Sequence, residues 1–199
     1  MKKIRRLGTL FFLGLFILCS CSNNQNQKVE TSASSFLKAL QDGNLLIAEE
    51  KSEWAIEELQ ALEVKEDDLV EGVDLQIQKK VLQKLTNFSY EIKGVEVEKE
   101  NAKVKVKLEL YDFNKALTTG EKEASKKLND LNKNSSLKNS QKEILRIFYE
   151  NMEKCEDKQE FSITLLLIQK NGEWIVSRNN DEFQHVLLKN VEDIISYLE

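Results

Sequence analysis

Residues 90–110 read YEIKGVEVEKENAKVKVKLEL, and this stretch determines the fold class. Apolar residues alternate with charged ones on both sides of residues 99–102, which is the period of β-strands with one buried face. We therefore expect an antiparallel hairpin that turns at residues 99–102. The alternation changes parity at Gly94, which predicts a β-bulge. On the exposed face, Glu96 should lie opposite Lys105, so that opposite charges pair across the strands.

A second hairpin is predicted nearer the C-terminus. Residues 159–169 alternate in the same way and lead to Asn171-Gly172, a pair typical of a two-residue type I′ turn. A two-residue turn also determines the register, which should place Lys170 opposite Glu173, Ile168 opposite Ile175, and Leu167 opposite Val176.

Most of the remaining chain has an apolar period near 3.6, which predicts helices. A first helix should begin near Ser32 and end at Gly43, and Asn44 should cap a second helix that extends to about Leu62. Further helices are expected from Glu66 to about Phe88, from Asn114 with a break at Gly120, from Ser140 or Ser135 to about Glu156, and from Asp181 to Leu198.

The order of these segments is helices, hairpin, helices, hairpin, helix, which predicts an α+β fold with an antiparallel sheet. We expect a single domain over residues 32–199. Its curved sheet of two hairpins should carry helices packed on one face. A helical insert between the hairpins and a C-terminal helix complete this expected architecture.

The N-terminus carries a separate pattern. Four basic residues precede a mainly apolar run of twelve residues, 7–18, which suits a signal-peptide core and is shorter than the roughly 20 residues of a membrane span. Leu18-Cys19-Ser20-Cys21 resembles the bacterial lipobox. The resemblance implies that residues 1–20 are removed as a lipoprotein signal peptide and that diacylglycerol is attached to Cys21. Cys19 fits less well, because Leu18 would then precede the cleaved bond.

The lipobox resemblance predicts a protein that is lipid-anchored in the cell membrane or outer membrane and faces outside the cytoplasm. Two or three acyl chains on Cys21 would hold it stably, since each buried methylene contributes about 0.8 kcal/mol. Residues 21–31 are polar and lack apolar periodicity, so we expect a flexible tether. The alternatives are an uncleaved N-terminal anchor and an ordinary cleaved signal peptide.

Composition restricts the class of partner. The chain has 29 basic and 34 acidic residues; removing four basic residues with the signal peptide leaves 25 against 34, a net charge of −9. An acidic domain argues against nucleic acid as a partner, because nucleic-acid binding requires a basic surface. With Cys21 lipidated, Cys155 is the remaining thiol, so no intramolecular disulfide is expected.

No group of residues in the sequence predicts catalysis, a metal site or a cofactor. His185 has no second ligand at a suitable spacing, and Cys155 lies on an apolar helical line, as a buried residue does. The acidic residues Asp67 and Asp68 lack the pattern of a calcium loop and suit a helix start. Tyr111 and Asp112, at the end of the second predicted strand, are the candidates for polar groups at a pocket. The alternative for Asp112 is a helix cap or a turn.

Three stretches resemble uncharacterised bacterial lipoproteins with a nuclear-transport-factor-2-like (cystatin-like) domain. They are residues 36–44 (FLKALQDGN), residues 90–110, and residues 170–175 (KNGEWI). The resemblance implies a cone formed by a curved antiparallel sheet with helices packed on one face. The long insert and the last helix depart from the simplest cone. No catalytic residue is carried over, because that group has no established site.

Together these patterns predict a non-enzymatic, membrane-anchored lipoprotein that binds an envelope protein or a small ligand. Two other classes remain open. One is a small hydrolase or isomerase that uses a cone cavity, and the other is an immunity or exclusion lipoprotein that blocks an incoming toxin or phage factor.

Overall fold

The computed structural model describes residues 24–60, 71–131 and 137–198 of the chain. The predictions for Cys21, for Asp67 and Asp68, and for a helix start at Ser135 lie outside these residues. The chain divides into two compact units. Unit 1 comprises residues up to Trp54 with 92–106 and 164–180, and unit 2 comprises 55–91, 107–163 and 181–199.

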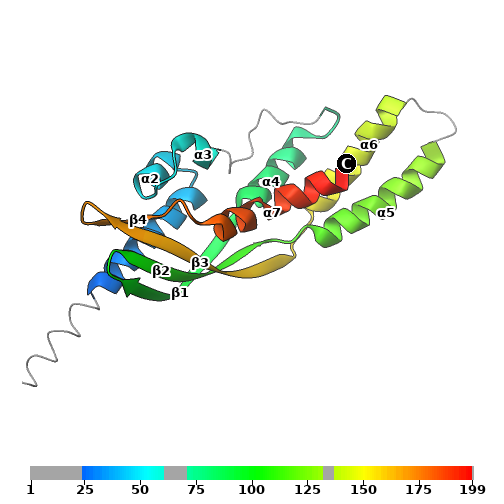
Figure 1. Cartoon of the computed structure of the whole chain (residues 1–199). Helices are drawn as coiled ribbons and strands as arrows, with labels where there is room; N and C mark the ends of the chain where they lie inside the picture. Colours follow the sequence, from blue (N-terminus) through cyan, green and yellow to red (C-terminus); the bar gives the residue numbers. More distant parts are fainter. Residues whose placement is uncertain (1–23, 61–70, 132–136, 199) are drawn as a thin grey trace, which may run out of the picture. The chain divides into compact units, whose positions relative to one another are not determined.

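The predicted α+β class is confirmed, because helices pack on an open, antiparallel four-stranded sheet in the order β1-β2-β3-β4 (Figure 1). The strands are β1 (Phe88–Glu98), β2 (Asn101–Tyr111), β3 (Lys158–Lys170) and β4 (Glu173–Val176). Burial along β2 alternates from residue to residue, so one face of the sheet is covered. In β1 the alternation shifts by one residue after Gly94, as the sequence predicts.

Both hairpins form where the sequence places them. In the first, the Lys105 ammonium lies 2.7 Å from the Glu96 carboxylate, which confirms that cross-strand pair. In the second, the pairs Lys170–Glu173, Ile168–Ile175 and Leu167–Val176 confirm the predicted register. Asn171 and Gly172 have φ of 54° and 84°, the left-handed values that a type I′ turn requires at both central positions.

In unit 1 the chain is helical throughout residues 24–41, and this corrects the prediction of a flexible tether for residues 24–31. The helix starts well before Ser32 because Val29 is fully buried and extends the apolar stripe that continues with Ala33, Phe36 and Leu37. The Phe36 ring packs edge-on against Trp54, with ring centroids 5.5 Å apart.

The second predicted helix is wrong in its length. Asn44 caps α2 (Leu45–Glu50) as expected, its side chain accepting from the Ile47 amide at 3.4 Å. The chain then leaves the helix, because Ser52 forms a parallel bridge with Val176 on the edge of β4. Backbone hydrogen bonds flank the bridge, from Val176 N to Lys51 O and from Glu53 N to Val176 O, both at 2.9 Å. The separate α3 (Ile56–Gln60) follows.

Unit 2 contains the remaining helices, and two of them differ from prediction at their starts. α4 (Leu75–Thr86) is capped by Asp74, whose carboxylate accepts from the Gln76 amide at 2.8 Å. Residues 71–74 are not helical, so this helix does not extend back toward Glu66, which lies outside the described residues. α6 (Leu137–Glu153) begins before Ser140, so Ser140 is not its cap. α7 (Asp181–Leu198) has the predicted bounds.

Gly120 does not break α5 (Asn114–Leu131), which is continuous. Glycine serves packing here, because a Cβ at this position would lie 2.9 Å from the Phe148 ring on α6. Such close approach lets α5 and α6 share one apolar cluster, to which α4 also contributes. Its buried members are Val81, Leu85, Phe113, Ala116, Leu117, Ala124, Ile147, Phe148, Met152 and Cys155.

Candidate functional site

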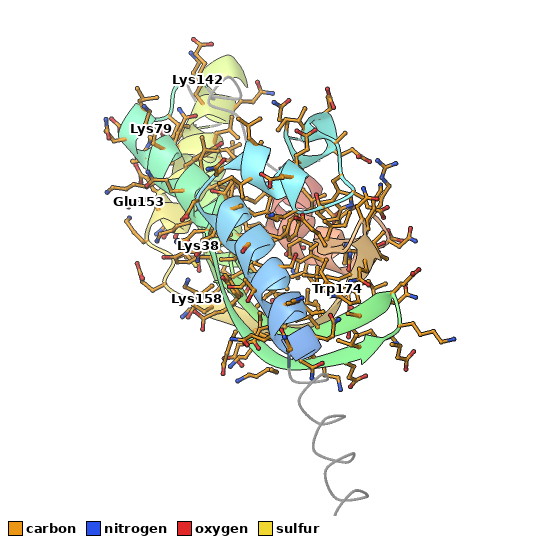
Figure 2. The ribbon with its side chains drawn as sticks, turned by 90° about the vertical axis from the view of Figure 1, so that its left-hand side faces the viewer. Lys38, Lys79, Lys142, Glu153, Lys158 and Trp174 are labelled. Atoms are coloured by element: carbon orange, nitrogen blue, oxygen red, sulfur yellow. The ribbon has the colours of Figure 1, made fainter. Side chains whose placement is uncertain are left out.

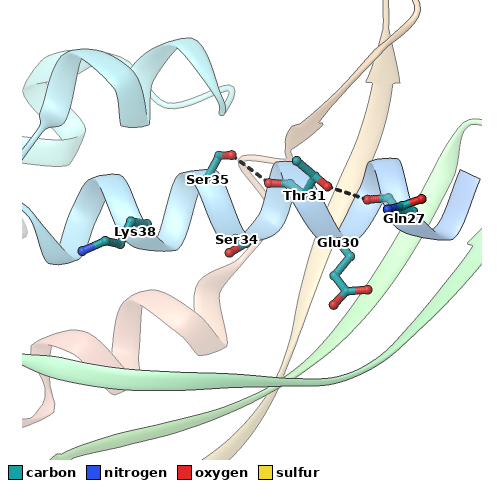
Figure 3. Close-up of a pocket in the computed structure, with 6 residues that line it drawn as sticks. All are labelled: Gln27, Glu30, Thr31, Ser34, Ser35 and Lys38. Carbon is teal, nitrogen blue, oxygen red and sulfur yellow. Dashed lines mark hydrogen bonds between the residues drawn. The ribbon is translucent and has the colours of Figure 1, made fainter.

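Two open hollows lie along the helix of residues 24–41 in unit 1. One, of about 470 Å³, is formed where this helix meets the β3–β4 hairpin; we call it the helix–hairpin hollow. It is lined by Asn24, Gln27, Lys28, Thr31, Ser32, Ser35, Lys51, Gly172, Glu173 and Trp174. The other, of about 450 Å³, follows the same helix and is lined by Gln27, Glu30, Thr31, Ser34, Ser35 and Lys38 (Figure 3).

Trp174 holds the helix against the hairpin. Its side chain is 5% exposed, and its indole nitrogen donates to the Gln25 side-chain oxygen at 3.2 Å. The Ser32 hydroxyl donates to the Trp174 carbonyl oxygen. Both contacts join residues more than 140 positions apart in sequence, so the packed hairpin determines where the helix lies and thereby the shape of the helix–hairpin hollow.

The lining of the two hollows is polar and carries charges of both signs. The Thr31 hydroxyl donates to the Gln27 carbonyl and the Ser35 hydroxyl to the Thr31 carbonyl, each at 2.8 Å (Figure 3). The hydroxyl oxygens keep acceptor capacity, because a hydroxyl can donate once and accept as well. This arrangement suits hydrogen bonding to a polar ligand or a protein surface.

The predicted pocket residues Tyr111 and Asp112 belong to unit 2 and line neither of these hollows. The Asp112 carboxylate accepts from the Asn114 backbone amide at 3.1 Å and from the Asn114 side chain at 2.8 Å. Asp112 therefore forms the turn at the start of α5, which is the alternative role that the sequence allowed for it. The Tyr111 ring stacks on Phe113, with centroids 6.2 Å apart.

Two lysines lie over the Tyr111 ring, Lys158 at 3.7 Å and Lys84 at 5.0 Å from its centroid. The Lys84 ammonium also donates to the carbonyls of Glu153 at 2.7 Å and Cys155 at 2.5 Å. Glu153 is the last residue of α6, so Lys84 satisfies carbonyls at the helix end, where positive charge is favourable. These contacts assign Lys84 a structural role.

Cys155 and His185 also belong to unit 2 and are not among the residues that line the hollows. Cys155 is buried, its thiol donates to the Asp112 carbonyl at 3.1 Å, and burial raises the pKa of the thiol. A thiol with a raised pKa is a weak nucleophile. His185 is exposed, with its Nδ1 3.4 Å from the Glu192 carboxylate. Among the described residues, no three His, Cys, Asp or Glu side chains gather as metal ligands would.

Asn180 is a buried polar residue that the sequence patterns did not single out. Its side-chain oxygen accepts from the Leu166 amide at 2.8 Å, and its nitrogen donates to the Leu166 carbonyl at 3.1 Å and the Ser177 carbonyl at 2.6 Å. The side chain thus imitates a peptide group and extends the pairing of β3 beyond the end of β4. An asparagine after a strand is so common in turns that its identity alone does not reveal this role.

Comparison with known proteins gives little beyond this geometry. No family model matches the sequence, and no curated protein matches it. One solved structure that matches is described as a "putative lipoprotein (ycdA)" of Bacillus subtilis subsp. subtilis str. 168, at 15% identity and a TM-score of 0.42. The match covers 57% of this chain and 37% of that protein, and a likeness this weak carries no argument about function.

The resemblance to nuclear-transport-factor-2-like lipoproteins therefore stays a prediction. Within the three described stretches of the chain, no helix has the length and apolar character of a membrane span.

Proposed function

We propose that this protein is a lipid-anchored, extracytoplasmic bacterial lipoprotein whose domain binds a partner without catalysing a reaction. The observation that carries the proposal is the order of segments in residues 1–21: basic residues, a mainly apolar run of twelve residues, and Leu18-Cys19-Ser20-Cys21. The apolar run suits a signal-peptide core, and acyl chains on Cys21 then supply the membrane attachment.

Replacing Cys21 by alanine tests the anchor. We expect Cys21→Ala to remove the protein from washed membranes or to leave the uncleaved precursor, because no sulfur remains to accept the diacylglycerol. Fractionation followed by immunoblotting, with labelled palmitate to detect acylation, measures both effects. The matched control is Cys19→Ala, which should retain normal processing and membrane attachment. Unchanged retention and processing of Cys21→Ala would exclude the anchor.

The two hollows along the helix of residues 24–41 are the binding surface that supports the second half of the proposal. Gln27, Thr31 and Ser35 line both hollows, so the same polar face of the helix forms one wall of each. Their volumes fall in the range of about 300–1,000 Å³ that is common for ligand sites. The occupant that suits this lining is an envelope protein or a small ligand with hydrogen-bonding groups.

Site-specific photo-crosslinking in intact cells tests this surface. A photoreactive amino acid at Gln27, which lines both hollows, should give a discrete adduct. Gel analysis detects a protein adduct, and mass spectrometry of the modified peptide detects a small one. The same amino acid at Asp42, which is exposed and lines neither hollow, serves as control. Equal labelling at both positions, or none at Gln27, would count against these hollows.

A further inference from the structure

Very little chain separates Cys21 from the helix of unit 1. The chain is already helical at residue 24, so residues 22 and 23 alone lie between the cysteine and the described helix. Three residue steps span about 11 Å at most, however they are arranged. A ten-residue flexible tether would instead have a root-mean-square length of roughly 17 Å and would let the domain turn freely.

Three segments of unit 1 lie at the end that this short connection holds. The first described turn of the helix lies beside the Asn171–Gly172 turn, because Asn24 and Gly172 line the same hollow. The turn between β1 and β2 joins them through a hydrogen bond of 2.8 Å from Gln169 N to Glu100 O. Figure 1 shows the first described turn of the helix, in dark blue, and both hairpin turns at one end of unit 1. We call residues 24–28, 98–101 and 170–173 the proximal end.

The proximal end has no net charge, whereas the whole chain is acidic, so the proximal end is better suited to lie against a bilayer surface. Its acidic and basic side chains balance, three against three: Glu98, Glu100 and Glu173, with Lys28, Lys99 and Lys170. An acidic surface is repelled by anionic headgroups, whereas a balanced one can approach them. The remainder of the mature chain keeps the net charge of −9.

We propose that the proximal end faces the bilayer directly, so that unit 1 stands on the membrane with its N-terminal helix leading away from the surface. This proposal rests on the lipid anchor at Cys21 and adds an orientation to it. It places the helix–hairpin hollow next to the headgroups, because Asn24 and Trp174 line that hollow.

The two tryptophans of the chain provide the test. Trp174 contacts Gln25, whereas Trp54 packs on Phe36, eleven residues and about 16 Å further along the helix axis. Figure 2 shows Trp174 beside the early turns of this helix and Lys38 further along it. The two indoles are similarly buried, at 5% and 2% exposure, so they differ in height above the membrane and not in access to solvent.

The experiment measures energy transfer from tryptophan to fluorescent headgroups. The protein is purified from membranes and reconstituted in phosphatidylcholine vesicles that carry a dansyl-labelled headgroup. Trp54→Phe leaves Trp174 as the donor, and Trp174→Phe leaves Trp54. From the offset of about 16 Å, we expect at least about twofold higher transfer efficiency from Trp174. Inserting ten Gly and Ser residues between residues 23 and 24 should remove most of this difference.

Vesicle flotation separates failure of this inference from failure of the anchor. Protein that does not float with vesicles would overturn the anchor itself. Protein that floats, but shows equal transfer from both tryptophans or more from Trp54, would overturn the orientation while keeping the anchor. Should a tryptophan variant not fold, dyes on Lys99→Cys and Asp42→Cys repeat the comparison at exposed positions, since Cys155 is buried.

Discussion

Replacing Asn180 by alanine is expected to lower the free energy of unfolding by about 2 kcal/mol, because a buried backbone amide without a partner costs about 1–3 kcal/mol. In the native structure the Leu166 amide donates to the Asn180 side chain, and Asn180 is only 3% exposed. The Leu166 carbonyl keeps its bond from the Ser177 amide, so the loss falls on the Leu166 N–H and on the Ser177 carbonyl. Chemical denaturation measures the effect.

Two further variants sharpen this test. Asn179→Ala, at the exposed neighbouring position, should change stability by less than about 0.5 kcal/mol. Asn180→Asp should be destabilising at neutral pH, because a carboxylate would face the carbonyls of Leu166 and Ser177. Those carbonyls would raise the folded-state pKa of the new carboxyl above its unfolded value of about 3.9, so its stability should recover as pH falls toward that value. A pH-independent loss would mean that the side-chain amide does not contact these carbonyls.

Replacing Lys84 by methionine is the other substitution for which we expect a large effect, a loss of about 2 kcal/mol. The ammonium donates to the carbonyls of Glu153 and Cys155, and the Lys84 side chain is 15% exposed. Methionine keeps an unbranched apolar side chain but removes the ammonium that bonds those carbonyls and lies over the Tyr111 ring. Hydrogen bonds to charged groups contribute about 1.5–3 kcal/mol. Thermal and denaturant unfolding give the change.

Lys80 supplies the matched control for Lys84. It lies one turn earlier on α4, and its ammonium pairs with the Glu153 carboxylate at 2.6 Å while remaining largely exposed. Lys80→Met should therefore have little effect, since exposed ion pairs are screened by water and salt. If Lys84→Met and Lys80→Met lowered the free energy of unfolding equally, the bonds from Lys84 to the carbonyls would contribute no more than an exposed ion pair does.

Local signals predicted the hairpins well and some helix ends poorly. Asn171-Gly172 determines a turn and a register within a few residues, and the structure has that register. The break after Glu50 has no comparable local signal, because it depends on the bridge between Ser52 and Val176. A contact across more than 120 residues cannot be inferred from the period of residues 45–62.

The helix at residues 24–31 was missed for a different reason. The segment is mostly polar and has one buried apolar residue, Val29. Val29 is four residues before Ala33 and therefore lies on the same helical face. Extending the apolar stripe backwards from Phe36 would have found it. The candidate site is harder to predict from the sequence, because the serines and the threonine that line it resemble those of any exposed helix. It exists because the β3–β4 hairpin packs beside them.

The bridge between Ser52 and Val176 also affects when the protein can fold. Residues 24–54 of unit 1 pack with strands that extend to Val176, so they have no complete sheet to contact until the chain has been synthesised beyond Val176. Contacts of such long sequence separation form slowly, because loop closure must precede the gain from pairing. We therefore expect residues 24–54 to reach their native packing only after β4 has been synthesised.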